Sequence, residues 1–352
     1  MTPRKIRFSH CVLQIAAGAL LSACWLQPAS AQTTGSAADA EAIAQQNWRE
    51  AIAHSPQPEQ GCFEASYPNL AWERVECKSF HPSVRPALRK PKNGESLVVG
   101  NGHDYVAEAA GLISETVGSF PTVTGVKSEK SVGVASFGDG GILGAHEYSL
   151  QINTNFNATT PACAGHSGCT VWQQFVYATD YYSYPSKGKG AVFIEYWLVN
   201  WGSSACPTNL PWESDGGGDC VVNSDLIEVP NAKPTALAKL SLTGTATKGG
   251  NDTAVFTNGT TAYSFSGSDS VVDISEAWKE SEFNIVGDAG GSEAIFNKKS
   301  SITVKVALTD GSTSAPTCVS NAGTTGETNN LNLGTCNTAG GSSPYIEFIE
   351  SN

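Results

Sequence analysis

The 352-residue chain carries 21 Lys plus Arg against 33 Asp plus Glu, a formal net charge of −12. The charge is uneven, because from residue 100 onward 11 Lys stand against 25 Asp plus Glu, a formal charge of −14. Such an acidic body argues against nucleic acid or an anionic membrane as a partner. It is typical of a highly soluble surface, and it also suits work in acid, where carboxylates take up protons.

The N-terminus is built like a secretory signal peptide. Basic residues within the first seven positions precede an apolar run, Cys11 to Trp25, that is too short to anchor stably in a bilayer. The small residues Ala29-Ser30-Ala31 form the A-x-A pattern at which signal peptidase cuts. We therefore expect a signal peptide over residues 1–31 and a secreted product, extracellular or periplasmic, that begins near Gln32.

A lipobox offers a second interpretation of the same region. Leu21-Ser22-Ala23-Cys24 resembles the bacterial pattern in which the cysteine is lipidated and becomes the new N-terminus. The A-x-A cut is favoured because Pro28 and a polar stretch lead into it, but lipidation at Cys24 stays open. No later segment has an apolar run long enough to cross a membrane, so no integral membrane segment is predicted.

The cysteines predict a disulfide framework. Two of the ten lie in the signal, and the other eight fall into sequence-adjacent pairs, Cys62 and Cys77, Cys163 and Cys169, Cys206 and Cys220, and Cys318 and Cys336. An even number in an exported chain indicates disulfides, and nearest-neighbour pairing is the simplest connectivity. Cys163, His166 and Cys169 also offer metal ligands, but an oxidising compartment favours the disulfide. No metal or cofactor is predicted.

Residues 32–95 form an N-terminal segment with one convincing helix. The stretch 38–52 is rich in Ala, Glu and Gln and places Ile43, Trp48 and Ile52 on one side. A basic, Pro-rich stretch at 81–92 then indicates an extended linker.

Residues 96–352 have an all-β pattern. Alternating or β-branched and aromatic stretches are separated by clusters of Gly, Asn, Ser and Thr. Strands are predicted at 148–156, 171–177, 192–199, 237–246, 253–256, 282–286, 301–308 and 345–349. The tail between Cys318 and Cys336 is predicted to be a long surface loop. The predicted fold is a concanavalin-like or jelly-roll antiparallel β-sandwich with a short helical N-terminal segment.

The usual motifs of nucleophilic and metal-dependent hydrolases are missing. The sequence has no G-x-S-x-G elbow, no H-E-x-x-H, no Walker loop and no G-x-G-x-x-G that opens a helix. Carboxylates and amides carried on strands remain as the candidate chemistry of a β-sandwich hydrolase.

Three stretches occur in the order found in one family. A strand with a central Gln, Val171-Trp172-Gln173-Gln174-Phe175, precedes an aromatic-rich strand with Glu and Trp, Phe193-Ile194-Glu195-Tyr196-Trp197, and Ser281-Glu282-Phe283-Asn284-Ile285-Val286 follows later. Over about residues 145–310 the chain resembles the eqolisins, secreted glutamic peptidases of concanavalin-like fold named for a catalytic Glu and Gln. The family's Gly soon after the Gln is not seen here, and the spacing between the first two motifs is longer.

The resemblance implies a peptidase that acts on polypeptides in acid. Glu282 would serve as general base toward a water and then as general acid to the leaving amine. Gln173 would orient the water and donate an amide N–H to the oxyanion. We expect these two side chains to face each other across one cleft. Gln174 faces the other side of a regular strand, so only one of the two glutamines can enter a given site.

The resemblance also suggests a role for the N-terminal segment. Eqolisin-type enzymes are made with a basic pro-segment that blocks the acidic domain until acid weakens the attraction. The stretch from Arg85 to Lys92 has the right charge to do this. A permanently attached cap with an ordinary linker is the alternative.

Two other classes of protein stay open. Jelly-roll glycosidases of the laminarinase type carry E-x-D-x-x-E on one strand, whereas Glu282 is followed by Asn284 and Gly287 at the matching positions. That reading needs a second carboxylate from Asp273, Glu276 or Asp288.

A non-catalytic carbohydrate-binding protein would stack exposed aromatic rings on sugars. Its candidate residues are Trp197, Asn200, Trp201, Tyr181 and Tyr182.

Overall fold

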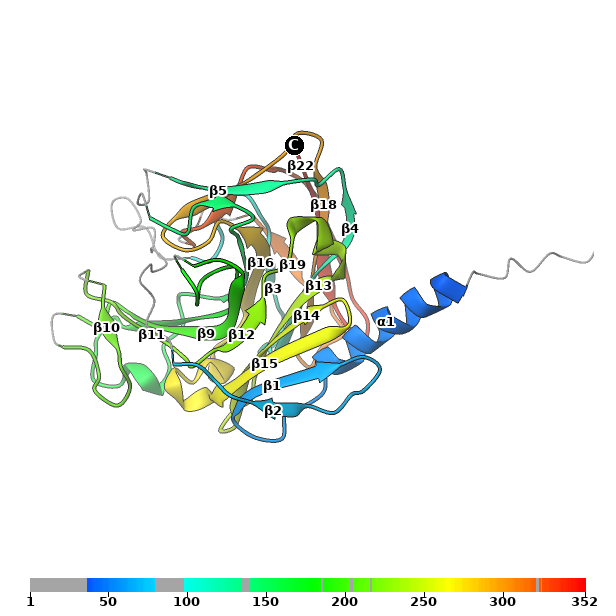
Figure 1. Ribbon diagram of the computed structural model, residues 1–352. Coiled ribbons are helices and arrows are strands. Elements are labelled where there is room, and N and C mark those ends of the chain that lie inside the picture. Colours follow the sequence, from blue (N-terminus) through cyan, green and yellow to red (C-terminus); the bar gives the residue numbers. More distant parts are fainter. Residues whose placement is uncertain are drawn as a thin grey trace, which may run out of the picture.

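A computed structural model describes residues 37–79, 98–134, 140–184, 186–202, 205–215, 217–320, 323 and 325–352. These residues form an antiparallel β-sandwich, which confirms the predicted fold class (Figure 1). The predicted signal peptide, Cys24 and the basic stretch 81–92 lie outside the described residues.

The first sheet of the sandwich, called sheet 1 below, combines strands from both ends of the chain. In spatial order its described strands are β2 (Glu73–Val75), β1 (Gly61–Ser66), β15 (Thr261–Ser268), β14 (Asn251–Asn258), β13 (Leu240–Ala246), β4 (Glu115–Thr124), β18 (Ser301–Thr309), β22 (Tyr345–Ser351) and β21 (Asn332–Ala339).

The second sheet, sheet 2, carries all three stretches of the eqolisin resemblance. Its described strands are, in order, β10 (Glu213–Ser214), β11 (Cys220–Asn223), β9 (Lys189–Val199), β8 (Thr170–Ala178), β7 (Ser149–Thr154), β16 (Glu280–Val286), β3 (Val106–Glu108) and β19 (Thr317–Val319), with β12 (Ile227–Pro230) paired to β9. The Gln-bearing β8 and the Glu-bearing β16 are both neighbours of β7 and are therefore separated by it.

A smaller third sheet and four short 3-10 helices complete the described elements. The third sheet orders β20 (Thr328–Asn329), β17 (Ser292–Phe296), β5 (Glu129–Gly133) and β6 (Gly144–Ala145), and its β17–β20 pair is parallel. The 3-10 helices are η1 (Pro161–Cys163), η2 (Pro234–Lys239), η3 (Asp269–Val271) and η4 (Ile274–Glu276).

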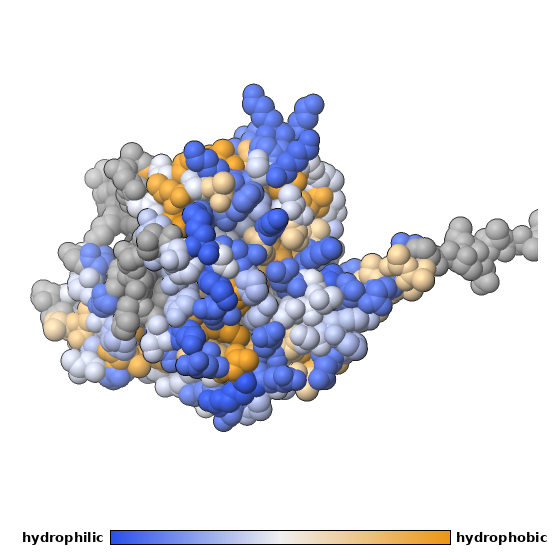
Figure 2. Space-filling view, viewed as in Figure 1, coloured by the Kyte–Doolittle hydropathy of each residue, from blue (hydrophilic) through white to orange (hydrophobic). Residues whose placement is uncertain are grey.

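Aromatic side chains from sheet 2 fill the space between the two large sheets. Phe283 of β16 lies on Gly118 of β4, where a Cβ would fall 2.1 Å from the ring. Phe175 of β8 lies on Gly244 of β13 in the same way, with 2.5 Å to a built Cβ. Both rings are fully buried, so these glycines let sheet 1 approach the strands that carry the candidate site. Figure 2 shows a mainly hydrophilic outer face with small separate hydrophobic patches.

The N-terminal segment is joined to the sandwich. Helix α1 (Ala37–Ala53) confirms the predicted helix and is anchored by its C-terminal half, where Trp48, Ile52 and Ala53 are buried (Figure 1). Strand β1 then pairs with β15 over six residues, and Phe63 is fully buried. The predicted boundary at residue 96 therefore does not coincide with the edge of the sheet, because β1 and β2 extend sheet 1.

Each predicted strand range overlaps an observed strand, although the first part of 237–246 is the 3-10 helix η2. The prediction of one long loop between Cys318 and Cys336 is wrong, because this stretch contains β20 and the start of β21. Strand β21 is a polar edge strand with few buried side chains, so it lacks the apolar alternation that reveals a strand.

The four predicted disulfides are confirmed, with nearest-neighbour pairing Cys62–Cys77, Cys163–Cys169, Cys206–Cys220 and Cys318–Cys336. Within the described ranges, no helix is both long and apolar enough to span a membrane.

Candidate active site

A row of polar side chains crosses the face of sheet 2 that points away from sheet 1. Register pairs Glu282 of β16 with Asn153 of β7, Asn153 with Gln174 of β8, and Gln174 with Glu195 of β9. Directly paired residues share a face of a sheet, so these four side chains lie side by side. All four are buried. We call Glu282, Asn153, Gln174 and Glu195 the polar row.

Hydrogen bonds connect three members of the polar row. The Gln174 Nε2 atom donates to Asn153 Oδ1 at 2.7 Å and to Gln151 Oε1 at 3.2 Å. Asn153 Nδ2 in turn donates to Glu282 Oε2 at 3.1 Å. Both N–H groups of Gln174 are therefore used, while its Oε1 is buried without a hydrogen-bond partner among the described residues.

Two covering segments meet at Glu282. Thr325 donates its hydroxyl to Glu282 Oε2 at 2.7 Å, and the backbone N–H of Gly100 donates to Thr325 Oγ1 at 3.2 Å. Asp104, on the same segment as Gly100, reaches the Glu282 carboxyl group. The Oε2 atom of Glu282 thus accepts one hydroxyl and one amide hydrogen bond, from Thr325 and Asn153.

Aromatic rings flank the polar row on the same face. Trp172 and Trp197, two residues before Gln174 and two after Glu195, are paired in register with ring centroids 5.7 Å apart. Trp197 Nε1 donates to Glu195 Oε1 at 2.7 Å. This contact fixes the orientation of Glu195 and leaves the row bordered by an apolar wall.

Burial keeps several carboxyl groups near the polar row protonated up to a higher pH than is usual for a carboxyl group. Burial raises the pKa of Glu327 to about 7, opposed by hydrogen bonds from the Gly291 backbone and Gln151 and aided by the charge of Glu282. Burial likewise raises the pKa of Glu350 to about 8, opposed by hydrogen bonds from Asn284 and Asn329. The buried carboxyl groups Glu327 and Glu350 therefore remain neutral throughout the acidic pH range.

The predicted pairing of Gln173 with Glu282 across one cleft is wrong. Gln173 points between the sheets, where its Nε2 donates to Asp252 Oδ2 of β14 at 2.9 Å. It shares that face with the core residues Val171 and Phe175. Glu282 lies on the opposite face of sheet 2, where Gln174 takes the place expected for Gln173.

The distances between the carboxylates do not support the alternative hypothesis of a glycosidase. Glu282 and Glu195 are three strands apart, or about 14 Å across the sheet, whereas a retaining or inverting pair needs about 5–9.5 Å. Asp288 lies two residues beyond the end of β16, where its Oδ2 accepts a hydrogen bond from Thr179. Asp273 and Glu276 lie at η4, which follows strand β15 of sheet 1.

The aromatic residues proposed for sugar stacking are largely enclosed. Trp197 and Tyr181 are buried, and half-buried Trp201 stacks on the His166 ring with centroids 3.3 Å apart. Among them Tyr182 is exposed. These residues do not form one open aromatic platform.

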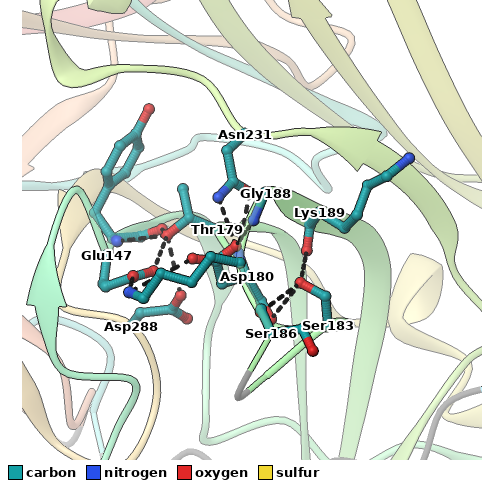
Figure 3. Close-up of polar contacts among 11 residues, drawn as sticks. Glu147, Thr179, Asp180, Ser183, Ser186, Gly188, Lys189, Asn231 and Asp288 are labelled. Carbon is teal, nitrogen blue, oxygen red and sulfur yellow. Dashed lines mark hydrogen bonds and ion pairs between the residues drawn. The ribbon is translucent and has the colours of Figure 1, made fainter.

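A second carboxyl cluster lies beyond the ends of β7 and β8 (Figure 3). Thr179 donates to Asp288 Oδ2 at 3.2 Å and contacts Glu147 Oε2 at 3.4 Å, while Lys187 binds Glu147 and approaches Asp180 to 3.8 Å. Burial raises the pKa of Asp288, and the charge of Glu147 raises it further. Across the described ranges, no three His, Cys, Asp or Glu residues are arranged to hold a metal ion.

Comparisons with known protein families, curated proteins and solved structures found no match to this chain. The site is therefore assigned from its own geometry.

Proposed function

We propose that the protein is a secreted, acid-acting endopeptidase that uses Glu282 and Gln174 to activate water for peptide-bond hydrolysis. The observation that carries this proposal is the connected row Gln174–Asn153–Glu282, in which a carboxamide and a carboxylate share one face and one hydrogen-bond relay. The expected Glu and Gln chemistry is kept, but Gln174 replaces Gln173.

The relay suggests a division of roles. Glu282 takes a proton from the attacking water and later gives it to the leaving amine. Gln174 acts through Asn153, because its Nε2 donates to Asn153 Oδ1 and Asn153 Nδ2 donates to Glu282 Oε2, so that the relay orients the base. This differs from the expected N–H donation to the oxyanion. A neutral amide keeps its hydrogen-bonding ability in acid, where a histidine base would be protonated.

Burial of the row adds a requirement. Glu282 and Gln174 are 1% and 0% exposed, so a substrate peptide reaches them only after a covering segment has moved. A precursor that is opened by acid meets this requirement, in keeping with the basic linker and the acidic body of the chain. Activity in acid is therefore expected to rise after a lag.

The test is cleavage of a denatured protein between about pH 2 and pH 7 by the full chain. Glu282→Gln keeps the shape but loses the proton acceptor, so turnover should fall by orders of magnitude with folding intact. Glu280→Gln, two residues earlier on the same strand, is the matched control and should cleave like wild type. Equal activity of Glu282→Gln and wild type would refute the assignment, and no cleavage by wild type would refute the peptidase function.

A further inference from the structure

Asp104 has an unusual position beside the proposed base. It precedes β3, whose Val106 pairs in register with Glu282 on β16. The Asp104 side chain is 0% exposed. One of its oxygens, Oδ1, accepts a long contact of 3.4 Å from the backbone N–H of Asn101.

The other oxygen of Asp104 has no donor. Among the described residues no N–H or hydroxyl group donates to Oδ2, although the atom is fully buried. The carboxyl group of Asp104 instead lies within hydrogen-bonding reach of the carboxyl group of Glu282. Two carboxyl groups can share a hydrogen bond only if one of them carries a proton.

The surroundings decide which group carries that proton. Glu282 Oε2 accepts hydrogen bonds from both Thr325 and Asn153. Asp104 has a single long backbone contact. Burial, and then the charge of Glu282, raise the pKa of Asp104 well above its usual range. Glu350 of β22 adds to this effect on Asp104, and Glu327 is the further acidic group that interacts with Glu282.

We propose that Asp104 is a positioning residue whose neutral carboxyl group donates a hydrogen bond to Glu282 and holds it ready as the base. This inference rests on the proposed peptidase function. Asp104 keeps its proton throughout and forms no bond to substrate. At higher pH the loss of that proton places a second negative charge beside Glu282 and removes the donor, so Asp104 also sets the upper pH limit of activity.

Two substitutions separate donation from ionisation. Asp104→Asn keeps a neutral donor, so kcat near pH 4 should stay within about 3-fold of wild type while the upper pH limit moves to higher pH. Asp104→Ala removes the donor, so kcat should fall by about 10-fold or more with KM little changed. The control is Asp252→Asn, a buried carboxyl on β14 of sheet 1 that binds Gln173 between the two sheets. It should keep the wild-type pH profile.

An infrared measurement tests the same inference without catalysis. The difference spectrum of wild type minus Asp104→Asn near pH 6 should contain the C=O band of a protonated carboxyl group. In Glu282→Gln this band should disappear at a lower pH than in wild type, because the neighbouring charge is gone. The absence of the band, or an unchanged pH profile in Asp104→Asn, overturns the inference. If wild type cleaves nothing but the band is present, only the peptidase function fails.

Discussion

Gln174 donates a 2.7 Å hydrogen bond to Asn153, whereas its neighbour Gln173 donates a 2.9 Å bond to Asp252 on the other side of the sheet. Two adjacent glutamines thus serve different parts of the protein. One belongs to the polar row with Glu282, and the other ties the two sheets together.

This division predicts different outcomes for the two alanine variants. Gln174→Ala should lower kcat per folded molecule by about 100-fold or more, because it removes the donor that orients Asn153 beside Glu282. It should also lower the melting temperature, because the buried acceptors of Asn153 and Gln151 lose their donor. Gln173→Ala should keep kcat per folded molecule but lose about 1–3 kcal/mol of stability, because Asp252 loses its buried partner. Kinetics and calorimetry on both variants check this. The reverse pattern would return the site to Gln173.

Glu195 is the second carboxylate of the polar row and the natural rival of Glu282. In Glu195→Gln the new amide oxygen can still accept from Trp197 Nε1, so we expect kcat to stay within about 10-fold of wild type. Cleavage assays on Glu195→Gln and Glu282→Gln at one acidic pH compare them directly. If Glu195→Gln alone is inactive, a glutamic peptidase remains but its base is Glu195.

Stability should be highest in acid and fall as pH rises. Burial raises the pKa of Glu129 to about 9 and that of Glu350 to about 8, so the folded protein binds more protons than the unfolded chain above about pH 4.5. The stability that these two groups contribute is fully present below about pH 4.5. It is lost as the pH rises through their folded-state pKa values. Calorimetry should show a melting temperature lower by about 10 °C near pH 8 than near pH 4.

Glu129→Gln is the variant that tests this cause. It should flatten the decline at high pH and change little near pH 4, where Glu129 is already neutral. A melting temperature that rises steadily toward pH 8 in wild type would contradict the expected sign.

Lys187 should matter mainly near neutral pH. It is the cation paired with buried Glu147, whose pKa is raised by burial and lowered by Lys187 (Figure 3). Lys187→Met should therefore destabilise the protein near pH 7 and leave it almost unchanged near pH 4, where Glu147 is protonated. Lys189→Met, at the exposed pair with Glu228, is the control and should cost under about 1 kcal/mol at either pH.

Cleavage in the basic linker should leave the N-terminal piece bound. The disulfide Cys62–Cys77 closes within that piece, and the other three lie wholly after it. The β1–β15 ladder and the buried Phe63 still hold the piece to sheet 1. After acid treatment, two fragments should therefore co-elute in gel filtration and separate in denaturing gels without a reductant. Immediate loss of the smaller fragment from the native protein would contradict this.

The sequence by itself determined the class of fold, the helix at the N-terminus and the disulfide pairing. Alternating and β-branched stretches are local signals, and cysteines close together in the chain have few partners to choose from. It also identified Glu282 as a candidate and showed that Gln173 and Gln174 face opposite sides, since a strand has a period of two.

Only the tertiary structure decided which glutamine faces Glu282. Both faces of β8 are apolar, with Val171 and Phe175 on one and Trp172 and Val176 on the other, so hydrophobic pattern did not reveal which face meets sheet 1. Strand β7 lies between β8 and β16. Its Asn153 belongs to the polar row only because the register of the sheet places it beside Gln174 and Glu282, which are 21 and 129 residues away in the sequence. Register and packing between distant strands are properties of the whole sheet, and no local stretch of sequence contains them.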